Sequence, residues 1–245
     1  MKQYGLIGEK LGHSFSKRFF TEKFEKESID AKYDLFELAN IDMIADLFTE
    51  KKPCGLNVTI PYKEQVIQYL DDIDQEAKEI GAVNTIQFRN VNGKIIKKGY
   101  NTDVIGFRDS LLPLLKEHHK KALILGTGGA SKAVAFVLGK LGIEYKYVSR
   151  RAAEGSFTYG DLTQEVMAEY TVIVNCTPVG MFPKVNAAPE IPYQYITEKH
   201  LLYDLIYNPE ETLFSKKGKE QGATTKTGLD MLYGQALASW KIWNE

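Results

Sequence analysis

The sequence predicts an α/β protein of two domains, the first of them with a mixed, mainly parallel sheet. Three observations support this prediction. Short apolar runs alternate with segments of helical period along most of the chain, as βαβ units require. The glycine-rich stretch from Gly126 to Ser131 lies between an apolar run and a helical pattern. A length of 245 residues gives room for two domains of moderate size.

The first domain is expected to span residues 1–103. The apolar periods change from strand to helix several times within it, and the dipeptide Asn92-Gly93 predicts a hairpin turn. The expected elements are strands at 4–7, 33–38 and 56–58, hairpin strands at 84–88 and 95–97, a helix carrying Phe15, Phe19, Phe20 and Phe24, and helices at 41–48 and 64–70.

The second domain is expected to span residues 104–228, because a new helix begins at Val104 and a polar stretch then separates it from the next strand. The last helix, 229–245, is expected to pack back toward the first domain. The other expected elements are a helix at 130–141 and strands at 122–125, 145–148, 172–175 and 201–204.

Composition excludes several classes of protein. There are 31 basic and 32 acidic residues, so no net positive field favours nucleic acid or an anionic membrane. No apolar run reaches the ~18 residues of a membrane span. The 2 cysteines, Cys54 and Cys176, show no metal or disulfide spacing and fit a reducing cytoplasm. The 4 histidines, His13, His118, His119 and His200, are not spaced as a triad or a metal site and receive no role.

The glycine-rich loop predicts a dinucleotide site. Glycines after a buried strand let backbone N–H groups approach a pyrophosphate at the start of the following helix. The alternative is a tight turn without a ligand, which gains weight because Ser131 replaces the third glycine of the fingerprint. The loop residues expected to contact the cofactor are Gly126, Thr127, Gly128, Gly129, Ala130 and Ser131.

The end of the next strand predicts which dinucleotide is bound. An acidic residue there would bind the ribose 2′-hydroxyl of NAD, whereas arginine accommodates the 2′-phosphate of NADP. This strand ends in Ser149-Arg150-Arg151, without an acidic residue. NADP is therefore the expected cofactor, unless the two arginines are solvated loop charges.

Polar clusters at the expected strand ends predict a polyhydroxylated ligand in a crevice between the domains. They supply hydroxyls, amides, one amine and one carboxylate. Each has a simpler explanation: Ser14 and Asp103 suit helix N-caps, and Lys63 suits a solvated surface. The clusters are Ser14-Phe15-Ser16, Asn57 to Lys63, Gly81-Ala82-Val83-Asn84-Thr85, and Asn101-Thr102-Asp103.

These four clusters, in this order, resemble the successive signatures of the shikimate dehydrogenase family. Further stretches continue the pattern, so the resemblance spans essentially the whole chain. They are the glycine loop, Asn175 to Met181, Asp204 through Tyr207-Asn208-Pro209, and Gly228 to Leu232 with Gln235-Ala236.

The resemblance implies a Rossmann NADP-binding domain after an N-terminal substrate domain, and it implies roles for individual residues. Lys63 and Asp103 are the implied catalytic pair, with Lys63 donating a proton to, or stabilising, the alkoxide that forms when a ketone accepts hydride. The implied shikimate contacts are Ser14, Ser16, Asn57, Thr59, Lys63, Asn84, Asp103, Tyr207 and Gln235. The nicotinamide side is implied to be lined by Asn175, Thr177, Met181 and Gly228, although Met181 by itself suits a core position.

Two departures from the family pattern stand out. Lys17 replaces the usual proline after the second serine, which leaves both serines in place. The segment after Arg151 is short, and Gly155 and Gly160 discourage a long helix, so the adenosine end of the site is expected to be trimmed.

The resemblance implies an NADP-dependent enzyme that interconverts 3-dehydroshikimate and shikimate in aromatic amino-acid biosynthesis, as a monomer or homodimer in the cytoplasm. Two alternatives remain open. One is a quinate/shikimate dehydrogenase that uses NAD, which Ser14 and the lack of an acidic residue beside Arg150 argue against. The other is a non-catalytic NADP-binding relative, which the presence of both Lys63 and Asp103 argues against.

Overall fold

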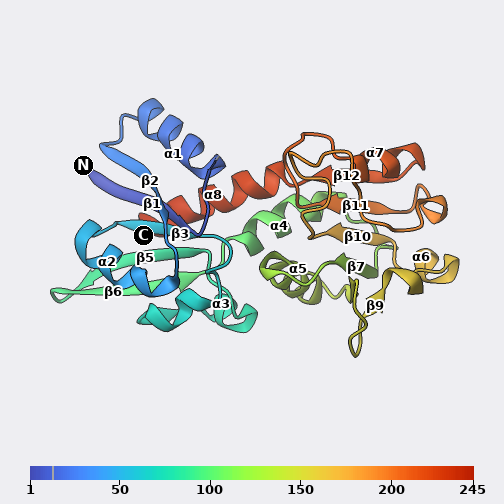
Figure 1. The fold of residues 1–245 in the computed structure, drawn as a ribbon, viewed down its shortest axis with the longest axis horizontal. Helices are drawn as coiled ribbons and strands as arrows, with labels where there is room; N and C mark the ends of the chain where they lie inside the picture. Colours follow the sequence, from blue (N-terminus) through green and yellow to red (C-terminus); the bar gives the residue numbers. More distant parts are fainter. Residues whose placement is uncertain (13) are drawn as a thin grey trace. The chain divides into compact units, whose positions relative to one another are not determined.

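The computed structural model describes residues 1–12 and 14–245, so His13 lies outside the described residues. The chain divides into two compact units (Figure 1). The N-terminal unit comprises Met1–Thr102 and Ala236–Glu245, and the C-terminal unit comprises Asp103–Gln235. This division assigns Asp103 and the first turns of the last helix to the C-terminal unit, whereas the sequence had grouped both with the N-terminal one.

A mixed sheet of six strands forms the centre of the N-terminal unit, as predicted. The strand order is β2-β1-β3-β5-β6-β4. β1 is parallel to β2 and β3, β4 is parallel to β6, and β5 is antiparallel to β3 and β6. The strands are β1 (Lys2–Gly8), β2 (Ala31–Glu37), β3 (Gly55–Val58), β4 (Asp72–Ile73), β5 (Thr85–Val91) and β6 (Lys94–Tyr100).

The two ends of the chain share an aromatic core in this unit. α1 (Phe15–Lys26) buries Phe20 and Phe24. The indole of Trp243, near the end of α8 (Leu229–Trp243), lies 5.0 Å from the ring of Tyr4 and 5.2 Å from that of Phe20. The C-terminal part of the last helix therefore packs on the N-terminal sheet, which confirms that prediction.

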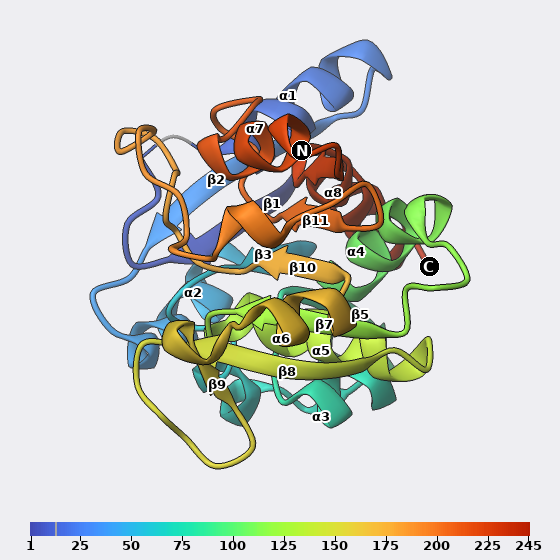
Figure 2. The same cartoon turned by 90° about the vertical axis from the view of Figure 1, so that its right-hand side faces the viewer.

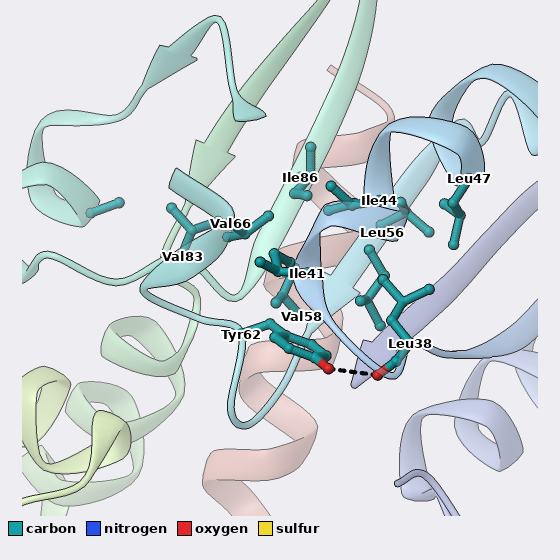
Figure 3. Close-up of a cluster of buried hydrophobic side chains, with 12 residues drawn as sticks. Leu38, Ile41, Ile44, Leu47, Leu56, Val58, Tyr62, Val66, Val83 and Ile86 are labelled. Atoms are coloured by element: carbon teal, nitrogen blue, oxygen red, sulfur yellow. Dashed lines mark hydrogen bonds between the residues drawn. The ribbon is translucent and has the colours of Figure 1, made fainter. Parts of the chain in front are cut away.

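A second apolar cluster, shown in Figure 3, packs the helical connection between β2 and β3 against the sheet. The 3-10 turn η1 (Ile41–Met43) continues into α2 (Ile44–Lys51), and together they bury Ile41, Ile44 and Leu47. The ring of Tyr62 is buried in the same cluster, and its hydroxyl donates to the Leu38 carbonyl over 2.5 Å. This packing fixes the segment that leads into Lys63.

The predicted hairpin is present, with Asn92 and Gly93 at φ values of 53° and 85°. These left-handed conformations are the ones that an Asn-Gly turn favours. The expected helix at 64–70 is instead a 3-10 helix, η2 (Gln65–Tyr69). Sequence reasoning also missed β4 and α3 (Gln75–Ile80), because neither is long enough to show a period.

The C-terminal unit has a six-stranded sheet in the order β12-β11-β10-β7-β8-β9, with every adjacent pair parallel. Figure 2 shows its central strands side by side. Numbered from β7 along the chain, this is the order 3-2-1-4-5-6 of the Rossmann fold. The strands are β7 (Lys121–Leu125), β8 (Glu144–Ser149), β9 (Phe157–Thr158), β10 (Val172–Asn175), β11 (Leu201–Asp204) and β12 (Thr224–Thr227).

Helices complete the C-terminal unit. The strands β7, β10 and β11 are buried along almost their whole length, as strands of a parallel sheet covered on both faces are. The helical segments are α4 (Asp103–Leu111), η3 (Leu112–Leu114), α5 (Gly129–Lys140), η4 (Tyr159–Asp161), α6 (Gln164–Glu169), η5 (Tyr193–Tyr195) and α7 (Leu213–Glu220).

The segment after Arg151 is as short as the sequence indicated. It forms the two-residue strand β9 and the 3-10 turn η4 before the six-residue helix α6 begins. Asp161 stabilises this turn, because its carboxylate accepts from both the backbone N–H and the hydroxyl of Thr158 over 2.7 Å each. None of the helices described is long and apolar enough to cross a membrane.

Candidate active site

The polar residues that the sequence singled out lie along one edge of the N-terminal sheet, where 'edge' means the line formed by the ends of its strands. β1 and β3 both end at this edge, at Gly8 and Val58. β5 runs in the opposite direction, so it begins there, and Thr85 pairs with Asn57. Thr59 and Asn84, which flank these strand ends, are therefore neighbours at a single edge.

A buried hydrogen-bond network lies beneath that edge, centred on Asn57. The Asn57 amide nitrogen donates to the hydroxyls of Ser239 (2.9 Å) and Thr85 (3.2 Å), and its oxygen accepts from the Tyr33 hydroxyl (2.7 Å). The side chain of Asn57 is thus occupied by protein groups. Its position suggests a structural role under the site, rather than the direct substrate contact implied by the resemblance.

Asn84 is held in one amide orientation. Its side-chain oxygen accepts from the Thr102 N–H over 2.7 Å and from the Thr102 hydroxyl over 3.1 Å. Because these donors fix the oxygen, the amide nitrogen is directed elsewhere and can donate to a ligand. Asn84 is 3% exposed, so little motion of this group is available.

Ser14 and Ser16 lie at the start of α1. The hydroxyl of Ser14 accepts from the Lys17 N–H over 3.3 Å, so it is the N-cap of the helix. Ser16 hydrogen-bonds the phenol of Tyr33, whose pKa is raised by burial. Both serines are partly exposed, and capping leaves the Ser14 hydroxyl proton available for a further acceptor.

Lys63 occupies a turn between β3 and η2. Its carbonyl accepts from the Val83 N–H over 2.7 Å, which ties it to the segment that carries Asn84. The preceding residue, Tyr62, is anchored in the apolar cluster described above. The backbone of Lys63 is therefore fixed on both sides, while its side chain is only partly buried.

Three predicted substrate residues belong to the C-terminal unit. Asp103 is the first residue of α4 and is 8% exposed. Gln235, on α8, is 7% exposed and donates from its amide to the Leu232 carbonyl over 3.0 Å. Tyr207 follows β11 and is 37% exposed.

A cavity of about 1170 Å³ opens at the carboxyl ends of the C-terminal strands. Its walls come from the segments after β7, β8 and β10, which meet where the strand order reverses, between β7 and β10. Ligands of open α/β sheets bind at this switch point. Of the predicted cofactor residues, those lining the cavity are Gly126, Thr127, Gly128, Ser149, Arg150, Arg151 and Thr177.

The glycines of the loop fit a bound phosphate. Gly126 has a φ of 95°, which favours glycine. At Gly128 and Gly129, by contrast, an added Cβ would meet no protein atom within 4 Å, so the protein's own packing does not require glycine there. Gly128 is the N-cap of the twelve-residue helix α5, whose first N–H groups form a site for an anion.

The tip of β8 presents two guanidinium groups to the same cavity. The Ser149 hydroxyl donates to the Arg151 carbonyl over 2.5 Å, so its proton is used inside the turn. Arg150 and Arg151 are therefore the donors available at the position where the 2′-phosphate of NADP binds in this fold.

Several predicted cofactor residues do not line the cavity. Ser131 is buried and donates to the Gly128 carbonyl over 2.6 Å. Asn175 is also buried, and its oxygen accepts from the N–H of Thr177 over 3.0 Å, which shapes the loop after β10. Met181 is 46% exposed, which excludes the alternative of a core position. Gly129, Ala130 and Gly228 also do not line the cavity. A Cβ on Gly228 would lie 2.1 Å from the Leu205 carbonyl oxygen.

Sequence reasoning missed residues on the outer wall of this cavity. Tyr159 and Glu190 line it together with Cys176. Burial raises the pKa of Tyr159, while the nearby Arg150 guanidinium lowers it, so the ring and the guanidinium are close. Burial also raises the pKa of the Cys176 thiol, which therefore stays protonated at neutral pH. The only sequence signal for Tyr159 was an aromatic residue in the shortened segment.

Comparison with protein families and known proteins agrees with this geometry. Residues 6–86 match the family described as the shikimate dehydrogenase substrate binding domain. The shikimate dehydrogenase (NADP(+)) of Clostridium beijerinckii is 40% identical over 257 residues, which cover 100% of this chain and 93% of that protein.

Solved structures show the same fold. The chorismate mutase/shikimate 5-dehydrogenase fusion protein of Clostridium acetobutylicum is 39% identical, with a TM-score of 0.86, over 99% of this chain and 91% of that one. Shikimate 5-dehydrogenase of Thermus thermophilus, in complex with NADP(H) and shikimate, is 29% identical with a TM-score of 0.85, over 99% of this chain and 93% of that one. The chain therefore belongs to the shikimate dehydrogenase family.

Proposed function

We propose that this chain is an NADP-dependent oxidoreductase that reversibly reduces 3-dehydroshikimate to shikimate. The observation that carries the proposal is the pairing of a dinucleotide cavity, with two arginines at its 2′-phosphate position, and a polar sheet edge bearing one lysine. Relatives named shikimate dehydrogenase (NADP(+)) match over nearly the full chain. We propose that it acts as a monomer or homodimer in the cytoplasm.

The chemistry of the cofactor site suits NADP. The loop Gly126 to Gly128 offers backbone donors for the pyrophosphate, and Arg150 and Arg151 offer charged donors for the 2′-phosphate. When bound, NADPH supplies the hydride. Thr177, Met181 and Gly228 are assigned to the nicotinamide side, and Asn175 is assigned to holding the loop that contains Thr177.

Hydroxyl and amide groups of the N-terminal unit suit a polyhydroxylated carboxylate. Ser14, Ser16 and Thr59 contribute hydroxyls, and Asn84 contributes the amide nitrogen that Thr102 leaves free to donate. From the C-terminal unit, Gln235 and Tyr207 are assigned to the same substrate. A substrate that satisfies these groups is preferred over an apolar one, because an unpaired buried donor costs about 1–3 kcal/mol.

Lys63 is assigned as the proton donor. When a ketone accepts hydride, charge develops on its oxygen, and an ammonium group within hydrogen-bond reach both stabilises that charge and transfers a proton. The fixed backbone of Lys63 limits the space that the ammonium group samples. Asp103 is assigned to orienting the lysine and accepting a substrate hydroxyl. In the direction of shikimate oxidation, the same side chain accepts the hydroxyl proton.

The test is an absorbance assay at the reduced-nicotinamide band with shikimate or quinate, each paired with NADP or NAD. The expected result is a higher kcat/KM for shikimate with NADP than for any other pair. Arg150→Ala should reduce the preference for NADP without changing kcat/KM for NAD, since the lost contact is to the 2′-phosphate. Equal efficiency with NAD, or a preference for quinate, would replace the proposal with the quinate/shikimate alternative. Binding of NADP without turnover of either substrate would indicate a non-catalytic relative.

A further inference from the structure

A second cavity, of about 880 Å³, lies within the N-terminal unit at the opposite edge of the sheet from Thr59 and Asn84. Lys2 begins β1 beside it and Cys54 precedes β3, so it faces the amino ends of the parallel strands. We call it the distal cavity. Its apolar wall consists of Tyr4, Phe48, Tyr69, Phe88, Ile95 and Trp243.

Contacts within the protein hold the aromatic wall in place. The rings of Phe48 and Phe88 pack edge to face with centroids 5.3 Å apart. The indole nitrogen of Trp243 donates to the Ile86 carbonyl over 3.0 Å, which fixes the plane of that ring. Ile95 is 51% exposed on the rim, so apolar surface at this site still faces solvent. Preformed apolar cavities of roughly 300–1,000 Å³ are the usual size for small-molecule sites.

The charged residues that line the distal cavity have a single sign. Three lysines line it, Lys2, Lys52 and Lys97, and no aspartate or glutamate does. Lys97 is paired with Asp71 over 2.7 Å. Within the part of the chain that the structure describes, Lys2 and Lys52 form no ion pair. Two uncommitted ammonium groups beside aromatic rings select for an anion with an apolar body.

The backbone holds Lys52 at the cavity in an uncommon conformation. Lys52 ends α2 in the left-handed region, with a φ of 43°. Such a conformation costs a non-glycine residue on the order of 1 kcal/mol. The next residues are fixed, since Pro53 is buried and the Cys54 N–H donates to the Gln3 carbonyl over 2.7 Å. The turn therefore sets the lysine at the mouth of the cavity.

We propose that the distal cavity binds a small aromatic carboxylate. The ring lies among Phe48, Phe88 and Trp243, and the carboxylate accepts hydrogen bonds from Lys52 and Lys2. This site takes no part in the reaction described above, because Lys63 and Asn84 lie at the other edge of the sheet. The same helix, α8, carries Trp243 in the cavity wall and Ser239 in the network beneath the substrate residues. A ligand in the cavity therefore contacts the same helix that supports that network.

The proposal is tested by calorimetric titration of the full chain with 3-phenylpropanoate and with its neutral analogue 3-phenylpropanamide. The carboxylate is expected to bind at least about tenfold more tightly, because one charge-assisted hydrogen bond contributes roughly that factor. The indole N–H resonance of Trp243 should shift during the titration. Equal affinity for the two probes, or no binding of either, would overturn the proposal.

Matched variants locate the binding. Ala45 is an exposed residue of α2 on the cavity wall, so Ala45→Trp should fill the cavity and abolish binding, whereas Asp46→Trp on the same helix should not. Lys52→Met should weaken the carboxylate at least about tenfold, whereas Lys51→Met, at the neighbouring lysine, should not. Binding that survives Ala45→Trp would place the probe elsewhere. Sedimentation that shows self-association, lost in Ala45→Trp, would identify a second copy of the chain as the occupant and overturn the proposal.

Discussion

At the scale of single residues, the site separates groups that face a ligand from groups that hold them. Asn57 and Asn175 were both expected to contact ligands, yet the side-chain amide of each is hydrogen-bonded to neighbouring protein groups. A buried amide with satisfied partners is rigid, and it transmits that rigidity to the residues it binds. Asn57 donates to the Asn84 carbonyl over 3.3 Å, and Asn175 accepts from the Thr177 N–H, so Asn84 and Thr177 are the residues held in this way.

Lys63→Ala is expected to lower kcat by about 10²–10⁴-fold, the usual contribution of a general acid, while changing KM for shikimate much less. Lys63→Arg should not restore the rate, because a guanidinium hardly releases its proton. The measurement is steady-state kinetics on variants shown to be folded by circular dichroism. Lys78→Ala, at an exposed lysine of α3, is the control. A Lys63→Ala enzyme with more than about half of the wild-type kcat would remove this residue from the mechanism.

Tyr159→Ala is expected to weaken binding of adenosine 2′,5′-bisphosphate, a ligand with the adenine and the 2′-phosphate but no nicotinamide. Stacking of a base on an aromatic ring contributes on the order of 1–3 kcal/mol, or roughly 5–150-fold in Kd. Tyr159→Phe should retain this affinity, since it keeps the ring. Competition against NADPH fluorescence measures the constants, with Tyr145→Ala as a control outside the cavity. Equal affinities for wild type and Tyr159→Ala would show that adenine binds elsewhere.

At the scale of elements, glycines allow two helices of the C-terminal unit to approach closely. Gly106 of α4 lies against the backbone of α8, where an added Cβ would be 2.2 Å from the Met231 carbonyl oxygen. From the other side, a Cβ on Gly234 would be 3.0 Å from the Cα of Gly106. The start of α8 is therefore fixed by contacts between backbones, and Gln235 sits in that stretch.

Gly106→Ala should destabilise the protein, because neither backbone can yield without moving a helix, and overpacking of this kind typically costs about 1–3 kcal/mol. Gly139→Ala, in α5, is a control with the opposite expected sign. An added Cβ there meets no atom within 4 Å, and alanine is favoured over glycine inside a helix by about 0.5–1 kcal/mol. Urea unfolding measures both. A stabilising effect of Gly106→Ala would contradict the close packing of α4 on α8.

At the scale of the whole molecule, each unit has its own apolar core and its own buried polar groups. In the C-terminal unit, Asp204 is fully buried and accepts from Thr212 (2.6 Å) and from Asn175 (3.0 Å). Burial raises its pKa to about 6, although these hydrogen bonds act in the lowering direction. Its titration therefore contributes to how stability depends on pH.

Between about pH 4 and pH 6 the folded protein holds a proton on Asp204 that the unfolded chain releases, so this group's contribution to the free energy of unfolding falls as pH rises through that interval. Asp204→Asn removes the titration. We expect wild type to lose stability relative to the variant from about pH 4 to pH 6, with a constant difference above about pH 7. The difference in stability between the two proteins is measured from their urea unfolding midpoints across this pH range. The buried His119 and His200, whose pKa values are lowered by burial, act in the opposite sense in both proteins and cancel in the difference. A pH-independent difference would contradict the raised pKa.

The sequence by itself determined the order of most elements, the mixed character of the first sheet, the Asn92-Gly93 turn and the cofactor loop, while its family resemblance predicted the Rossmann domain. The features other than the Rossmann domain depend on local periods, turn chemistry and the spacing of glycines, all of which can be seen in the sequence. It did not predict β4, α3, β9, α6, α7 and β12, because elements of two to eight residues carry too little periodicity, and it predicted a regular helix where the structure has the 3-10 helix η2.

Only the tertiary structure decided which polar side chains face a cavity and which are occupied inside the protein. Ser131 and Asn175 match cofactor motifs, yet they hydrogen-bond within the C-terminal unit, whereas Tyr159 belongs to no motif and lines the cavity. The distal cavity likewise combines residues from both ends of the chain, Lys2 and Trp243. The physical reason is that burial and hydrogen-bond partners are set by contacts between residues far apart in sequence, and motif spacing contains no information about those contacts.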